Sequence, residues 1–217
     1  MKYKNERGRS MVEMLGVLAI VGVLSAGALA GYLKAMTQHK LNKHTQEISY
    51  LLATAIYNQD KIIDTNSQKE YISALKALGA FTWTTTLQNQ GESTYKIITD
   101  SLQNTISFEH SAGSGTAFVV ILNKSDFRMK VCYNYINIFK NLSNELDVIY
   151  VTRSKTGQAK ERNTYIGKTC TSGKCLKSVT NTNISELCGQ VCDDADRCVL
   201  YALWGYPAST VAGLLGQ

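Results

Sequence analysis

The residues Met14–Leu33, MLGVLAIVGVLSAGALAGYL, form the longest apolar stretch of the chain. They carry no charge, and Ser25 and Tyr32 are the only side chains among them with a polar group. A helix rises about 1.5 Å per residue, so twenty residues reach about 30 Å, the thickness of the hydrocarbon core of a bilayer. Because a lone segment in lipid must satisfy its own backbone, residues 14–33 are predicted to form a transmembrane helix.

Basic residues and cysteines indicate which way this span is oriented. The positive-inside tendency favours a cytoplasmic N-terminus only slightly, by four basic residues before the span against three closely after it. These are Lys2, Lys4, Arg7 and Arg9, and Lys34, Lys40 and Lys43. All six cysteines follow the span: Cys132, Cys170, Cys175, Cys188, Cys192 and Cys198. An even, clustered set after an export-type N-terminus is typical of disulfides in an oxidising compartment, so the body is predicted to lie outside the cytoplasm.

The composition is that of a chain that can fold. Of its 217 residues, 44% are hydrophobic and 18% are charged, which excludes a disordered or polyelectrolyte chain. The net charge of +6 is modest, and basic residues are not interleaved with aromatic ones in a defined patch, so no nucleic-acid partner is indicated.

Signals for catalysis are poor, and neither an enzyme nor a cofactor is expected. The sequence Gly167-Lys168-Thr169 resembles the end of a phosphate-binding loop, but Arg162 stands where that motif requires glycine. No nucleophile motif accompanies the three histidines, His39, His44 and His110.

Glu13 is an acidic residue at the start of the apolar stretch, five residues after Gly8. Around it, the segment RGRSMVEMLGVLAI (residues 7–20) resembles the N-terminus of type IV prepilins and of the related pseudopilins of type II secretion. The resemblance implies a leader over residues 1–8, cleavage between Gly8 and Arg9, methylation of the Arg9 amine and an assembly role for Glu13. The chain departs from the family at Arg9, where an apolar residue is usual, and at Ala30, where many members have proline.

The resemblance also implies partners and a location. The partners are other pilin subunits, a prepilin peptidase, an inner-membrane assembly platform and the lipid bilayer. The chain would start as a single-pass protein of the inner membrane and move to an extracellular filament or a periplasmic pseudopilus. In such a polymer the amine of one Arg9 can offset the desolvation of another copy's Glu13. Four glycines would allow close helix contact, although glycine is common in membrane helices anyway: Gly16, Gly22, Gly27 and Gly31.

The helix is predicted to continue beyond the membrane, as one helix over residues 9–58. An apolar stripe at helical spacing indicates an amphipathic second half: Leu41, Ile48, Leu51, Leu52, Ala55 and Ile56.

The remaining sequence predicts an α+β head in which the long helix packs on an antiparallel sheet. A capping box at Ser67–Glu70 begins a helix with Tyr71, Ile72, Leu75 and Leu78 on one face, ending at Gly79. A second helix is predicted over 126–142, and strands over 95–99, 105–109, 116–123 and 147–152. Residues 153–163 are predicted to be a surface loop, and the apolar segment 199–215 to be core or interface. The globular α+β part of the head is predicted over 59–163, and the cysteine-rich C-terminal region of the head over 164–217.

Two metal-site interpretations compete with disulfides and solvated surface, and neither is favoured. The cysteine spacings are C-x4-C and C-x3-C, and no histidine lies nearby, which is unlike a zinc site. If the six cysteines pair into disulfides, fifteen connectivities are possible. Asp193, Asp194 and Asp196 lack the glycine and distal glutamate of a calcium loop, so they are expected to be solvated, and no metal is expected.

Two other functions remain open from the sequence. The Ala28-Leu29-Ala30 sequence fits a signal-peptidase site, so the chain could be a soluble exported adhesin-like domain that is cut after Ala30. It could also be a single-span membrane protein that does not polymerise. Glu13 and the uninterrupted helical pattern favour the pilin-like interpretation.

Overall fold

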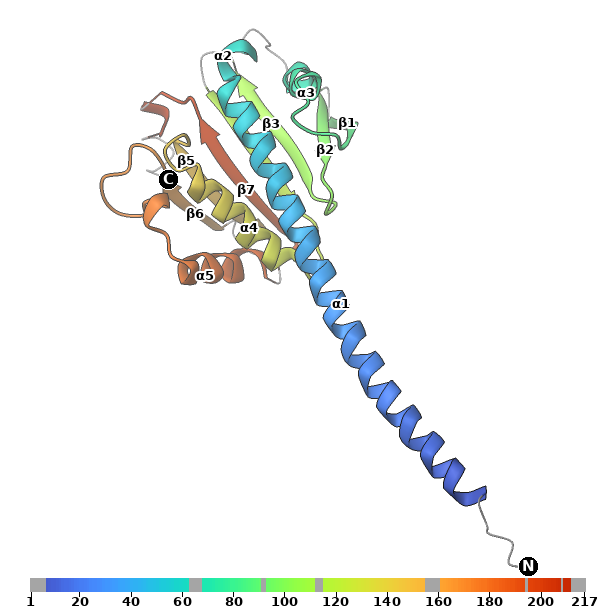
Figure 1. Ribbon diagram of the computed structural model, residues 1–217. Coiled ribbons are helices and arrows are strands. Elements are labelled where there is room, and N and C mark those ends of the chain that lie inside the picture. Colours follow the sequence, from blue (N-terminus) through green and yellow to red (C-terminus); the bar gives the residue numbers. More distant parts are fainter. Residues whose placement is uncertain are drawn as a thin grey trace, which may run out of the picture. The chain divides into compact units, whose positions relative to one another are not determined.

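The computed structural model describes residues 7–62, 68–90, 93–111, 115–154, 161–193, 195–207 and 209–211. The chain divides into two units, residues 1–43 and 44–217. Helix α1 (Arg7–Tyr57) contributes its first part to one unit and its last part to the other (Figure 1). Its single run of 51 residues confirms the predicted long helix, and the sequence has no proline that would break it, since the one proline is Pro207.

The second unit, called the head below, is built on a seven-stranded antiparallel sheet with the order β1-β2-β3-β4-β7-β5-β6. The strands are β1 (Thr84–Gln90), β2 (Ser93–Thr99), β3 (Thr105–Ser111), β4 (Gly115–Leu122), β5 (Val148–Ser154), β6 (Glu161–Ile166) and β7 (Arg197–Trp204). The α+β fold class is therefore confirmed. Strand β7 comes from the end of the chain and lies between β4 and β5, and both central strands, β4 and β7, are largely buried on both faces.

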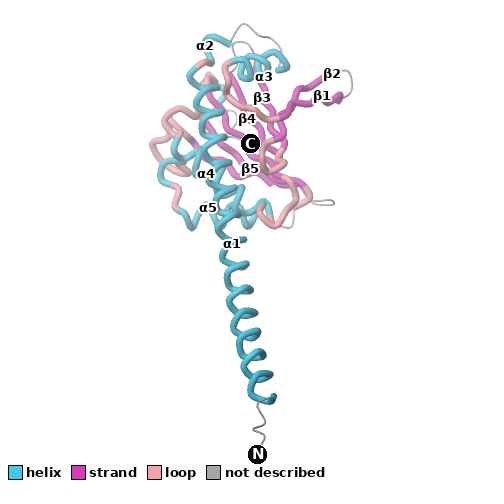
Figure 2. Tube along the Cα trace, turned by 45° about the vertical axis from the view of Figure 1, so that its right-hand side comes forward, coloured by secondary structure: helices cyan, strands magenta, loops and turns pink. Residues whose placement is uncertain are grey.

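The shorter helices of the head are α2 (Gln59–Ile62), α3 (Gln68–Ala77), α4 (Arg128–Asn141), the 3₁₀ turn η1 (Leu176–Ser178) and α5 (Asn181–Cys192). In Figure 2, α4 and the last part of α1 lie over one face of the sheet. Aromatic contacts join this face to α4: the Phe118 ring of β4 lies 6.1 Å from both the Tyr135 and the Phe139 rings. The apolar stripe of α1 is buried here, with Ile48, Leu51, Leu52 and Ala55 all 0% exposed.

The opposite face of the sheet carries a smaller apolar cluster. Side chains alternate between the two faces along a strand. The residues of β4 and β7 that do not face α4 and α1 therefore point to this side. Its centre is formed by Ala117, Val119, Val199 and Leu203. The Tyr150 and Tyr201 rings stack at 4.2 Å beside them, and the Arg162 guanidinium lies 4.0 Å from the Tyr150 ring centre. The predicted burial of the segment after residue 199 is confirmed as far as Trp204, while residues 212–215 lie outside the described part.

Several local predictions need correction. Strand β1 was not predicted, and β6 covers part of the segment 153–163, which was predicted to be a loop. Both are edge strands whose residues are mostly polar, so neither shows the alternation that a half-buried strand gives. Leu78 is 48% exposed, because α3 ends at Ala77 and Leu78 lies in the following turn. Gly79 closes that turn with φ of 72°, as predicted, whereas the Ser67 cap lies outside the described residues.

All six cysteines form disulfides, so the zinc interpretation is wrong. The pairs are Cys132–Cys188, Cys170–Cys175 and Cys192–Cys198. They join α4 to α5, close a short loop, and join the end of α5 to β7. Asp193 and Asp196 are exposed, Asp194 is not described, and no group of three His, Cys, Asp or Glu residues within the described ranges could hold a metal ion.

Candidate functional site: an exposed apolar helix and a buried polar cluster

The first part of α1 exposes an apolar surface on every side. Its large apolar side chains between Met11 and Leu33 are 52–74% exposed. Leaving one such side chain in water instead of burying it costs about 1.5–3 kcal/mol, so this surface requires a bilayer or other helices around it. The helix is long and apolar enough to cross a membrane, which is what the sequence predicts.

The residues implied by the prepilin resemblance lie at the start of α1. Gly8, Arg9 and Glu13 are all helical, and the Glu13 side chain is exposed one turn after Arg9. The cleavage, methylation and assembly roles of these residues stay predictions.

Within the part of the chain that the structure describes, nothing outside their own helix packs against the four glycines of this segment. A Cβ atom added at Gly16, Gly22, Gly27 or Gly31 would meet no atom within 4 Å. Each glycine leaves a low point on the helix surface where another helix can approach closely. Their role in helix packing stays a prediction.

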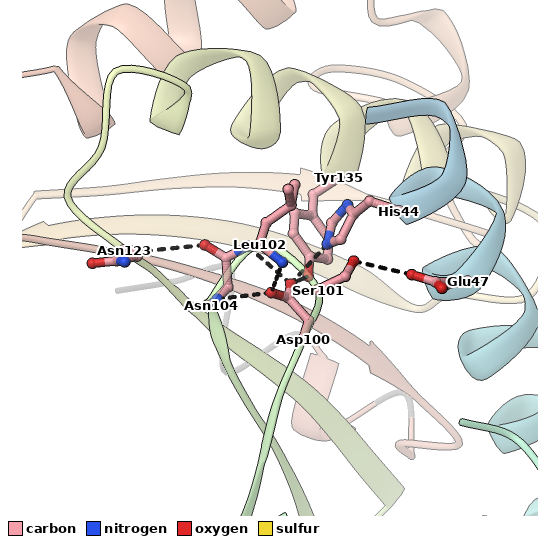
Figure 3. Close-up of polar contacts among 8 residues, drawn as sticks. All are labelled: His44, Glu47, Asp100, Ser101, Leu102, Asn104, Asn123 and Tyr135. Atoms are coloured by element: carbon pink, nitrogen blue, oxygen red, sulfur yellow. Dashed lines mark hydrogen bonds and ion pairs between the residues drawn. The ribbon is translucent and has the colours of Figure 1, made fainter. Parts of the chain in front are cut away.

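In the head, a polar cluster fastens the last part of α1 to two other elements (Figure 3). His44 and Asp100 are 0% and 2% exposed, and the His44 Nε2 lies 2.7 Å from the Asp100 Oδ2. The Tyr135 hydroxyl of α4 donates to the same oxygen at 3.1 Å, and the Asn104 Nδ2 donates to it at 2.8 Å. Since a carboxylate only accepts, Nε2 is the nitrogen of His44 that donates its proton. The other nitrogen, Nδ1, is buried and has no hydrogen-bond partner among the described residues.

Asp100 also organises the turn between β2 and β3. Its Oδ1 accepts hydrogen bonds from the backbone amides of Leu102 at 2.9 Å and Asn104 at 2.8 Å. Gln103 takes the left-handed conformation in this turn, with φ of 65°. The Ser101 hydroxyl then donates to Glu47 of α1 at 3.0 Å, which adds a second link between the turn and the helix.

The electrostatics of the cluster keep Asp100 ionised and Tyr135 protonated. Burial alone would raise the pKa of Asp100, but the hydrogen bond and charge of His44, with the hydrogen bonds of Asn104, outweigh it and lower the pKa. Burial and the neighbouring carboxylate raise the pKa of Tyr135 well above its usual value. The cluster therefore holds a buried carboxylate with its donors arranged around it, and its groups are shielded from solvent. This arrangement suits fastening the helix rather than reacting with a substrate.

No sequence motif identifies this cluster. His44 is one of three histidines without a nucleophile motif, so the sequence alone assigns it no role. The available signal was its position, because His44 precedes Ile48 by one turn and so falls on the apolar stripe of α1. A histidine on the buried stripe of a helix requires a partner, but Asp100 lies 56 residues away in the sequence and could not be identified without the fold.

Replacing Asp100 with asparagine is expected to flatten the acid dependence of stability. The folded-state pKa of Asp100 lies below the unfolded value of about 3.9, so its ionised form contributes stability fully above that value. This contribution is lost as the pH falls through the folded-state pKa. Urea unfolding in detergent from about pH 6 to about pH 2 should therefore show a smaller loss of unfolding free energy for Asp100→Asn than for the unmodified chain.

The exposed Asp126 supplies the matched control for that series. Asp126→Asn should follow the unmodified chain through the whole titration. An Asp100→Asn curve parallel to the unmodified one would contradict the assigned role of the carboxylate.

No protein-family model matches the chain, and no curated protein resembles it significantly. A search of solved structures found a type IV b pilin from Salmonella typhi, with 15% sequence identity and a TM-score of 0.43. The match covers 76% of this chain and 99% of that chain. A score of this size is too low to establish a common fold.

Proposed function

We propose that the chain is a structural subunit of a type IV pilus or a related pilus-like filament, and that it assembles through the first part of α1. The observation that carries this proposal is the apolar first part of α1, whose large side chains from Met11 to Leu33 are exposed, with the acidic Glu13 near its start. The prepilin-like segment over residues 7–20 supports the same function. A subunit of this kind works by packing and has no catalytic step.

The proposed assembly step is an exchange of surroundings for the apolar helix. In the bilayer, lipid covers the helix; in the filament, neighbouring helices cover it, and the low surface at the glycines lets them approach closely. After cleavage behind Gly8, the new amine of Arg9 would lie beside the Glu13 carboxylate of another copy. Each charge then offsets the desolvation of the other, and removal of either leaves a buried charge without a partner.

The proposed location follows from the helix and the disulfides. The uncleaved chain would cross the inner membrane once, with its head outside the cytoplasm, where three disulfides form readily. A prepilin peptidase and an inner-membrane platform would then act on it, and the product would be an extracellular filament or a periplasmic pseudopilus. Whichever of these forms, the partners of the helix are other subunits.

Two alternatives remain, and the helix itself bears on one of them. A signal peptidase acting after Ala30 would cut in the middle of α1, which runs without a break from Arg7 to Tyr57. The released chain would be an exported adhesin-like domain. The other alternative is a single-span protein that never polymerises.

The mature N-terminus separates these outcomes. Intact-mass measurement and N-terminal peptide mapping of the membrane-extracted protein are expected to show a chain that begins at Arg9 and carries one added methyl group. A chain that begins at Gly31 would indicate the exported domain. A chain that retains Met1 would indicate an unprocessed membrane protein.

A further inference from the structure

The buried stripe on the last part of α1 contains four apolar residues and one polar one. Ile48, Leu51, Leu52 and Ala55 are all 0% exposed, and so is His44. Apolar contacts have no preferred direction, so they define the position of a helix along its axis only through the shapes of the side chains. A hydrogen-bonded pair of buried groups is directional, and it is satisfied at one position only.

A slip of the helix by four residues, about 6 Å, shows the difference. It would bring Ile48 to the place of His44, Leu52 to that of Ile48, and Ala55 to that of Leu51. The last two exchanges replace one apolar side chain with another. The first would put an isoleucine against the Asp100 carboxylate, which would keep its charge in a buried site without its histidine.

A slip by three residues is opposed as well. It would bring Glu47 to the place of His44, so that two carboxylates would face each other. Like charges that share a buried site repel each other strongly. The displacement of His44 thus carries an electrostatic penalty in both cases.

We propose that His44, Asp100 and Tyr135 form a register clamp, which holds the last part of α1 at a single axial position and rotation in the head. Asp100 is the centre of the clamp, because its carboxylate accepts from the helix, from α4 and from its own turn. The three residues act as positioning residues. Their contribution to the specificity of the packing is separate from any contribution to stability.

The clamp is tied to the disulfides of the head. Cys132 lies one turn before Tyr135 on α4 and is bonded to Cys188 of α5. Cys192, one turn after Cys188 at the end of α5, is bonded to Cys198 of the central strand β7. A continuous series of directional and covalent links therefore runs from α1 to the middle of the sheet. If the proposed function holds, this series resists sliding of the head along α1 when the helix is drawn into a polymer.

Spin-label distances test the clamp in the isolated full chain in detergent, with no polymer involved. All six native cysteines are in disulfides, so cysteines introduced at the exposed positions Tyr50 on α1 and Glu186 on α5 would be the only free thiols. With the native clamp, pulsed electron–electron double resonance is expected to give one population of distances between the two spin labels. In the His44→Leu/Asp100→Asn background, a second, displaced population is expected, at least about tenfold larger than any displaced fraction found with the native clamp. Asparagine is chosen because its side-chain oxygen still accepts from the turn.

Ile48→Ala is the matched control, because it weakens the same buried stripe by a cavity and leaves the polar groups in place. It should lower the melting temperature and keep a single distance population. Tyr135→Phe removes one hydroxyl from the clamp and should give a smaller displaced population than the double variant. It replaces the double variant in the test if that variant does not fold. A single native distance in the clamp variants, or equal broadening in Ile48→Ala, would overturn the clamp and leave the proposed polymer function unaffected.

Discussion

Replacing Glu13 with alanine is expected to reduce incorporation of the chain into filaments to background while its insertion into the membrane is unchanged. In the proposed filament, Glu13 faces the Arg9 amine of another copy among apolar helices. Alanine leaves that amine buried without a counter-charge, a loss that typically costs about 3–5 kcal/mol per contact. Because the same contact repeats at every subunit, the loss is repeated along the polymer. Sheared filaments and membrane fractions, probed for the chain, measure the two quantities separately.

Glu47→Ala is the matched control, since it makes the same change on the same helix. Glu47 lies in the head and bonds to Ser101, so its loss should leave assembly close to the unmodified level. Filaments of normal yield and composition from Glu13→Ala would contradict the pairing role. Loss of the chain from the membrane would also contradict it, because the proposal assigns Glu13 to assembly and not to insertion.

Removal of the Cys132–Cys188 disulfide is expected to lower the unfolding free energy of the head by about 4 kcal/mol, the amount that the chain-entropy model gives for a closed loop of this length. The bridge links residues separated by 56 positions and joins α4, which carries Tyr135, to α5. The variant Cys132→Ser/Cys188→Ser replaces both partners, so no odd thiol is left. Chemical unfolding in detergent, followed by tryptophan fluorescence, measures the change.

The Cys170–Cys175 bridge provides an internal comparison, because it spans only 5 positions. The same model gives about 2 kcal/mol for a loop this short, so Cys170→Ser/Cys175→Ser should have about half the effect. If the short bridge proved as important as the long one, loop closure in the unfolded chain would not explain their contributions.

The sequence predicts the elements whose signal lies in residues close together along the chain. Residues 14–33 predict an apolar helix by length alone, and the spacing of Ile48, Leu51, Leu52 and Ala55 predicts the buried stripe that the structure shows. Strands β3, β4 and β5 were predicted close to their bounds because buried strands are rich in β-branched and aromatic residues.

The rest depended on contacts between distant residues. The edge strands β1 and β6 are held by pairing with β2 and β5, and their own polar residues give little signal. The disulfide connectivity was one of fifteen, and the meeting of α4, α5 and β7 decided it. Asp100 lies in a polar turn after a strand, and nothing local identifies it as the partner of His44. The proposed assembly residues Gly8, Arg9 and Glu13 came from the sequence resemblance, and their roles depend on other copies of the chain.

The composition of purified filaments tests the central claim most directly. Filaments sheared from cells, or pseudopili recovered from the periplasm, would be imaged by cryo-electron microscopy and mapped by peptide mass spectrometry. The account predicts that this chain lies in the polymer, beginning at Arg9, with the first part of α1 packed against its neighbours and each Glu13 beside another subunit's amine. Polymers that lack the chain, together with a chain that stays solitary in the membrane, would contradict it.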